Sequence, residues 1–66
     1  MKHYLFCETT SGEEFIVSAE NEVNAYEIAE PIGVDLANMW ADGDPDLECY
    51  GTISEEEAEN SGLDEY

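Results

Sequence analysis

An extreme imbalance of charge is the feature that most limits how this chain can fold and what it can bind. Among its 66 residues, 18 are Asp or Glu and only one is Lys or Arg, so the formal net charge at pH 7 is −17. Repulsion among these carboxylates opposes any compact state, and an apolar core must outweigh it. Apolar residues make up 42% of the chain and include seven aromatic residues. This content predicts an ordered small domain rather than a disordered segment.

The same imbalance predicts which partners the protein can bind. Proteins hold nucleic acid and anionic membranes mainly through Lys and Arg, and Lys2 is the only such residue in the chain. We therefore expect a monomer that binds neither nucleic acid nor membrane directly and that binds a basic protein. The short apolar run in residues 1–8 ends at an acid and resembles neither a signal peptide nor a membrane span, which predicts a cytoplasmic protein.

The pattern of apolar and turn-forming residues predicts an α+β fold in a single domain over residues 1–66, without a linker. Residues 2–9 and 13–19 have strand character on either side of a Thr-Thr-Ser-Gly turn, which is typical of a β-hairpin. Residues 47–53 predict a third strand that pairs antiparallel with this hairpin. The expected order is β-β-α-α-β-α, with a small three-stranded antiparallel sheet and helices packed mainly on one face.

The helices are predicted from amphipathic spacing and from capping residues. Residues 22–30 form the first, capped by Ser18 or Asn21 and stopped or kinked at Pro31. A second short helix is expected over residues 36–41. Ser54 to Glu57 matches a capping box, so a third helix begins there, ends near Gly62 and is followed by a tail that frays.

Alternation along the strands predicts which side chains share a face of the sheet. In the first strand, Leu5 and Cys7 lie on one face while Tyr4 and Phe6 lie on the other. We expect Tyr4 and Phe6 to share the second face with Tyr50, where they anchor a partner or are covered by a helix or by the C-terminal tail. In the third strand the alternation places residues 47, 49, 51 and 53 together.

No pattern of residues in the chain indicates catalysis. His3 and Cys7 are about 13 Å apart along an extended strand, which is too far for a nucleophile and its base. Asp42 to Asp46 begins like a calcium loop, but Leu47 stands where the glycine of an EF-hand is required. We therefore expect no enzyme activity, no cofactor and no dedicated metal site.

The two cysteines, Cys7 and Cys49, could form at most one disulfide. Small secreted scaffolds that depend on disulfides usually carry four or more cysteines, so free thiols are expected. A bridge between neighbouring strands is the alternative.

The acidic residues are concentrated toward the C-terminal part of the chain, where residues 42–66 hold ten of the 18. Alternating acids over residues 42–48 would project to one side about 6.7 Å apart in an extended chain, similar to phosphates along a nucleic-acid strand. A solvated surface that keeps the protein soluble is the simpler interpretation. The residues expected to bind a partner are Asp42, Asp44, Asp46, Glu48, Glu55, Glu56, Glu57, Glu59, Glu13, Glu14 and Tyr50.

The size of the chain, its charge of −17 and the acidic runs over residues 42–48 and 55–59 resemble a class of small phage-encoded inhibitors that mimic DNA. The resemblance is greatest to anti-CRISPR proteins that act on a type I Cascade complex, with type I-C as the nearest subtype. It implies binding to the positively charged DNA-contacting surface of the effector in a bacterial host cell, and a block of target-DNA recruitment. The alternative is a small acidic adaptor or antitoxin-like protein that neutralises another basic protein.

Overall fold

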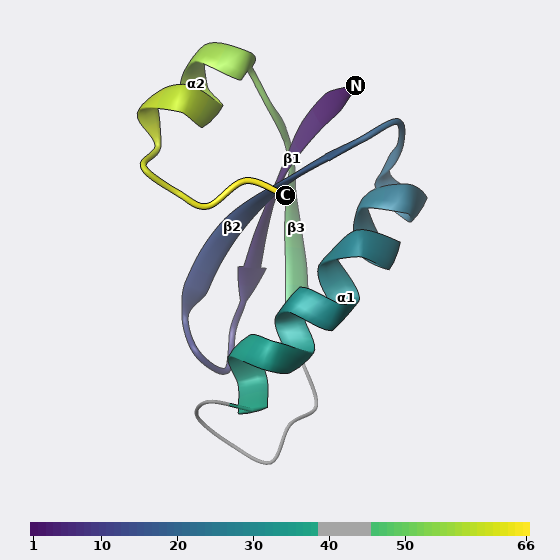
Figure 1. The fold of residues 1–66 in the computed structure, drawn as a ribbon, viewed down its shortest axis with the longest axis vertical. Coiled ribbons are helices and arrows are strands. Elements are labelled where there is room, and N and C mark those ends of the chain that lie inside the picture. Colours follow the sequence, from purple (N-terminus) through teal and green to yellow (C-terminus); the bar gives the residue numbers. More distant parts are fainter. Residues whose placement is uncertain (39–45) are drawn as a thin grey trace.

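The computed structural model describes residues 1–38 and 46–66 and contains a three-stranded antiparallel sheet with the strand order β2-β1-β3 (Figure 1). The strands are β1 (Lys2–Glu8), β2 (Glu13–Ala19) and β3 (Leu47–Ile53). The helices are α1 (Glu22–Asn38) and α2 (Glu55–Asn60). The predicted α+β class, the hairpin and the antiparallel third strand are confirmed, and β1 is the central strand.

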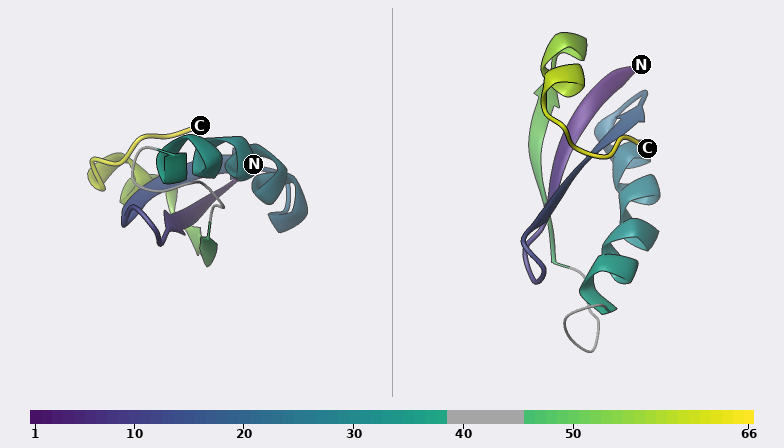
Figure 2. Two further views of the ribbon diagram at one scale, coloured as in Figure 1. Left: turned by 90° about the horizontal axis from the view of Figure 1, so that it is seen from below. Right: turned by 60° about the vertical axis from the view of Figure 1, so that its left-hand side comes forward.

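Helix α1 lies along one face of the sheet (Figure 2). Asn21 is its N-cap, because the Asn21 side-chain oxygen accepts a hydrogen bond from the Asn24 backbone N–H at 2.9 Å. The helix continues through Pro31 to Asn38, so the predicted stop at Pro31 is wrong. Proline removes one intrahelical hydrogen bond. A buried stripe of small residues on both sides of the proline keeps the helix against the sheet: Ala25, Ala29, Gly33 and Ala37.

The predicted second helix over residues 36–41 is therefore not a separate element where the structure describes it. Residues 36–38 form the last turn of α1, and residues 39–41 lie outside the described ranges. Leu36 packs against the core.

Aromatic rings fill the space between α1 and the sheet. Phe6 stacks on Phe15 with ring centroids 5.8 Å apart, and the ring of Tyr26 from α1 is perpendicular to that of Phe6 with centroids 5.0 Å apart. Phe6, Phe15 and Val17 are fully or almost fully buried. Such aromatic pairs stabilise a core by about 0.5–1.5 kcal/mol each beyond the burial of their area.

The register of the hairpin shows which face of β1 lies against α1. Phe6 pairs with Phe15 and Tyr4 with Val17, so Tyr4 and Phe6 face α1 together with the core residues of β2. Both are buried, so the structure bears out the alternative in which a helix covers them, and neither is exposed as an anchor for a partner. Tyr50 is on the surface, with 55% of its area exposed, and lies beside Cys7 on the opposite face, so the prediction that it shares a face with Tyr4 and Phe6 is wrong.

A β-bulge in β3 alters the alternation that the sequence predicted for this strand. Phe6 pairs with Cys49 but Tyr4 pairs with Thr52, so β3 contains one extra residue between these pairs. Gly51 lies in this bulge with φ +95°. Ile53 consequently pairs with His3 and lies on the face opposite α1, away from Cys49, which corrects the predicted face.

The bulge makes stability sensitive to the residue at position 51. An L side chain is strained at φ +95°, although the space around the Gly51 Cα is open, so Gly51→Ala is expected to lower the free energy of unfolding by about 1–2 kcal/mol. Chemical denaturation measures this change. D-alanine at the same position adds the same methyl group without the strain and should restore stability. Equal losses with the two enantiomers would contradict the explanation.

The C-terminal residues do not fray as predicted, because they pair with the outer edge of β2. The Ile16 N–H donates to the Asp64 carbonyl at 2.9 Å, and the Tyr66 N–H donates to the Ile16 carbonyl at 2.8 Å. The Tyr66 ring is perpendicular to the Phe15 ring, with centroids 5.9 Å apart. The tail therefore covers an edge that could otherwise pair with another chain.

Among the described residues, no helix has the length and apolar character needed to cross a membrane.

Candidate functional site

Acidic side chains cover the described surface. Of the 18 acids, Asp42 and Asp44 lie outside the described residues, Glu8 is buried and the other 15 are exposed. Every predicted partner-binding residue that the structure describes is on the surface: Asp46, Glu48, Glu55, Glu56, Glu57, Glu59, Glu13, Glu14 and Tyr50. The structure places seven of them in two groups, while Glu13 and Asp46, which directly precedes β3, belong to neither.

The first group lies on the sheet face opposite α1, and we call Glu14, Glu48 and Tyr50 the acidic sheet face. Glu14 and Glu48 are the neighbours of Cys7 in β2 and β3, so the three residues form one row across the sheet. Adjacent strands are about 4.8 Å apart, which places the backbones of the two acids about 10 Å apart. Glu13 alternates to the other face and is not part of this group.

Tyr50 is the aromatic member of the acidic sheet face. The interaction of its hydroxyl with the side chain of Cys7 is the main reason that the pKa of Tyr50 is raised. The negative charges of Glu48 and Glu14 raise this pKa further. Tyr50 therefore stays protonated beside two carboxylates and presents an apolar ring with a hydrogen-bonding group, which is a common composition for an interface anchor.

The second group is α2, which follows β3 and lies near the start of β1 (Figure 1). The predicted capping box is confirmed: the Ser54 hydroxyl accepts from the Glu57 N–H at 3.1 Å, and the Glu57 carboxylate accepts from the Ser54 N–H at 3.4 Å. Acids in the first turn are stabilised by the unpaired N–H groups at the helix N-terminus. Glu57 therefore has a structural role, whereas Glu55, Glu56 and Glu59 are exposed and outside the capping box.

Glu8 is an acid whose structural role the sequence analysis missed. It is fully buried at the end of β1, where one carboxylate oxygen accepts from the Ser11 N–H at 2.7 Å and the other from the Asp46 N–H at 2.9 Å. Thr9 adds a hydrogen bond from its N–H to the Asp46 carbonyl at 2.8 Å. Glu8 thus ties the hairpin turn to the start of β3, which leads to Glu48 in the acidic sheet face.

Two opposing effects act on the pKa of Glu8, and their net result is a pKa below the ordinary value of 4.5. Burial removes water from the carboxylate and raises the pKa, but hydrogen bonds from the backbone of Asp46, Ser11 and Thr10 stabilise the charged form and outweigh it. Glu8 is therefore a buried carboxylate that stays ionised at neutral pH. The burial of Glu8 could have been predicted from the sequence, because Glu8 follows Tyr4 and Phe6 at a spacing of two and therefore lies on the same face of β1.

Both cysteines are free, as expected. Cys7 lies in the row with Glu48, whereas Cys49 pairs with Phe6 and faces the core, so the two thiols point to opposite faces of the sheet. This geometry rules out the alternative of a bridge between them. Burial raises the pKa of the Cys49 thiol, which keeps it protonated and unreactive.

In residues 1–38 and 46–66, no group of three or more His, Cys, Asp and Glu side chains is placed to hold a metal ion. Comparisons of the chain with protein-family models, with curated proteins and with solved structures find no match.

Proposed function

We propose that the protein is an acidic decoy that imitates DNA and occupies the positively charged nucleic-acid-binding surface of a partner protein. The partner surface uses Lys and Arg to contact phosphates, and carboxylates can replace phosphates as the acceptors of these contacts. The decoy inhibits by binding alone, without catalysis and without a cofactor. It acts in the cytoplasm of a bacterial host cell.

The density of negative charge is the observation that supports this proposal most strongly. The longest dimension of the protein is 34 Å, and its net charge is −17. Duplex DNA carries one charge per about 1.7 Å of axis, so the same 34 Å of duplex carries about 20 negative charges. The protein therefore approaches the charge of a duplex segment of its own length, which is far more than solubility requires.

The resemblance to small phage-encoded inhibitors suggests a particular receptor, the type I Cascade complex of a CRISPR system. In that case the acidic sheet face and α2 occupy the channel that receives target DNA, and recruitment of the target is blocked. Charge would accelerate the encounter of the two proteins, and Tyr50 would prolong the complex by burying its ring.

Competition with DNA tests the proposal. The purified protein is immobilised, and binding of a type I surveillance complex is measured with and without a saturating duplex, at two salt concentrations. We expect saturable binding that the duplex abolishes and that higher salt weakens. Binding that is indifferent to duplex would favour the acidic adaptor or antitoxin-like alternative, and absence of binding would remove the type I assignment.

A further inference from the structure

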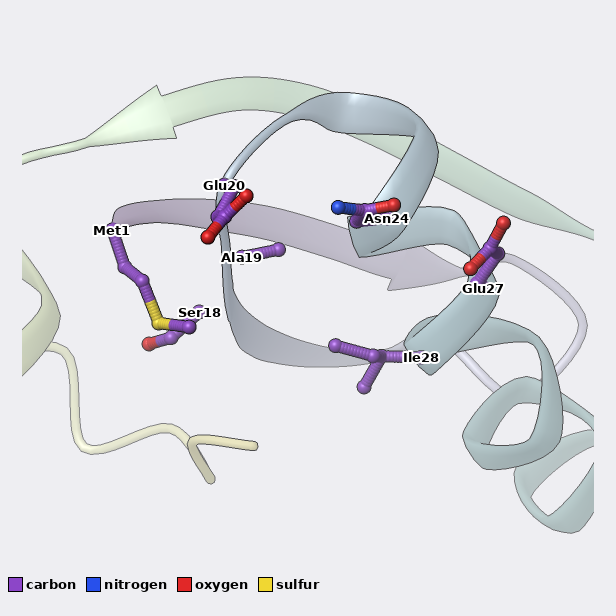
Figure 3. A pocket seen from close by; sticks show the side chains of 7 residues that line it. All are labelled: Met1, Ser18, Ala19, Glu20, Asn24, Glu27 and Ile28. Atoms are coloured by element: carbon purple, nitrogen blue, oxygen red, sulfur yellow. The ribbon is translucent and has the colours of Figure 1, made fainter.

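A groove lies where the start of β1, the end of β2 and the first two turns of α1 meet (Figure 3). Its volume is about 400 Å³, which is near the lower end of the range for small-ligand sites. Buried Ala19 lies at its centre, and Met1 and Ile28 form apolar walls. Met1 is 87% exposed and Ile28 is 40% exposed, so both walls offer apolar area to a bound group.

Polar acceptors surround these apolar walls. Glu20 follows β2, and Asn24 and Glu27 come from adjacent turns of α1, where a spacing of three places them on the same side of the helix (Figure 3). The residues that line the groove include two carboxylates and no Lys or Arg. The groove therefore combines an apolar channel with a negatively charged rim.

We propose that this groove receives an arginine side chain of the basic partner. The methylene groups of arginine would pack against Met1 and Ile28, because long cationic side chains bury their stems while the charged head stays at a polar rim. The planar guanidinium carries five N–H donors, which suits the carboxylate of Glu27 and the amide oxygen of Asn24 on neighbouring turns. The net charge of −17 favours this cationic occupant and disfavours a second copy of the chain.

This inference rests on the proposed function and extends it, because it names one group that the partner inserts. The groove and α2 both lie toward the end of the molecule at which β1 begins (Figure 1). A basic surface that lies across this end could contact the α2 carboxylates with several side chains and place one arginine in the groove. Contacts of arginine with DNA phosphates are common in the proteins that such a decoy would inhibit.

A peptide with a single arginine tests the groove independently of the receptor. The full chain, labelled with ¹⁵N, is titrated with a capped Gly-Ala-Arg-Ala-Gly peptide and with the same peptide containing citrulline, which keeps the shape but lacks the charge. We expect millimolar, saturable binding of the arginine peptide, with amide shifts concentrated at Ala19, Asn24, Glu27 and Ile28. Shifts spread evenly over the acidic surface, equal binding of citrulline, or absence of binding would overturn the inference.

Two matched pairs of variants separate the groove from the general charge. Glu27→Gln and Glu30→Gln each remove one exposed charge from α1, but only Glu27 lines the groove. Ile28→Ala and Val34→Ala each shorten an apolar residue of similar exposure on α1, 40% and 38%, but only Ile28 lines the groove. We expect Glu27→Gln and Ile28→Ala to weaken binding of the arginine peptide about threefold. The control variants Glu30→Gln and Val34→Ala should leave this binding almost unchanged.

The outcomes distinguish this inference from the proposed function. Equal effects within each pair, in the presence of DNA-sensitive binding to the surveillance complex, would refute the groove and leave the decoy in place. Binding of the peptide in the groove without any binding of the complex would refute the assignment of the receptor.

Discussion

Replacement of Glu8 by Gln is expected to lower the free energy of unfolding by about 2 kcal/mol at pH 7, because it leaves a part-buried backbone N–H without an acceptor. The Glu8 carboxylate accepts from Ser11 with one oxygen and from Asp46 with the other. Glutamine has the same shape but only one side-chain oxygen, and its NH₂ group would face the second backbone N–H. Urea denaturation measures the loss.

Glu13→Gln is the matched control for this change. Glu13 is the direct neighbour of Glu8 in the β1–β2 register, and it is exposed. Its replacement removes the same charge and relieves the same general repulsion, so it should leave stability unchanged or raise it slightly. If Glu8→Gln and Glu13→Gln were equally stable, the buried hydrogen bonds of Glu8 would not be the cause.

The difference in stability between the wild type and Glu8→Gln should depend on pH in a defined direction. The folded protein lowers the pKa of Glu8, so the unfolded chain takes up the proton first as the pH falls. The contribution of Glu8 is therefore complete above its ordinary pKa of 4.5 and is lost as the pH falls below that value and through the lowered pKa. The other 17 acids titrate in both proteins, so their effects cancel in the difference.

Denaturation of both proteins from about pH 7 to about pH 3 measures this dependence. A difference that stays constant over the range would mean that the ionised carboxylate contributes nothing specific. A loss at acid pH would also affect the surface, because Glu8 holds the backbone of Asp46, two residues before Glu48.

Local patterns were sufficient to predict much of the fold. The hairpin, the Asn21 cap and the Ser54 capping box each depend on residues within a few positions of one another, and the structure confirms all three. In each case a backbone N–H group at a turn or helix end requires an acceptor, and the sequence supplies it nearby.

The predictions that failed depend on contacts between distant segments. Pro31 is tolerated because α1 packs its small residues against the sheet. Helix propensity describes single residues and does not include this packing. The shared face expected for Tyr50 with Tyr4 and Phe6 depends on how β3 pairs with β1, and it failed; whether Tyr4 and Phe6 are covered was left open, because a shift of the β1–β2 register by one residue would have exposed them. The bulge at Gly51 adds one residue to β3 and so moves Ile53 to the other face, and the alternation of residues along the sequence does not predict such a bulge.

The candidate site was predictable in composition but not in arrangement. The sequence identified Glu14, Glu48 and Tyr50 as residues that bind a partner, because acids and an aromatic residue suit a basic surface. It did not indicate that the three share one face, because that depends on how the strands pair. Glu8 was missed for the converse reason. Glu8 is one of 18 acids, and its type alone does not distinguish it from the exposed ones. Only its position in the strand, at spacing two from the core residues Tyr4 and Phe6, indicates that it is buried.

Charge reversal on α2 should weaken binding to the surveillance complex about 100-fold, the largest effect on function that we expect. Glu56→Lys with Glu59→Lys changes the net charge from −17 to −13 and spares the capping box of Ser54 and Glu57. The two lysines would face Lys and Arg of the partner, so the change replaces attraction by repulsion at the contact. Binding kinetics at two salt concentrations measure the loss, which should fall mainly on the association rate and shrink at higher salt.

Glu30→Lys with Asp35→Lys is the control for α2, because it produces the same net charge by changing two exposed acids of α1 that lie outside the groove. If the decoy presents a defined surface that includes α2, this control should weaken binding by less than about threefold. If the two double variants lose affinity equally, the partner responds to the overall field of the protein and not to α2. That result would leave an acidic decoy without a directed face, and it would contradict the assignment of α2 to the interface.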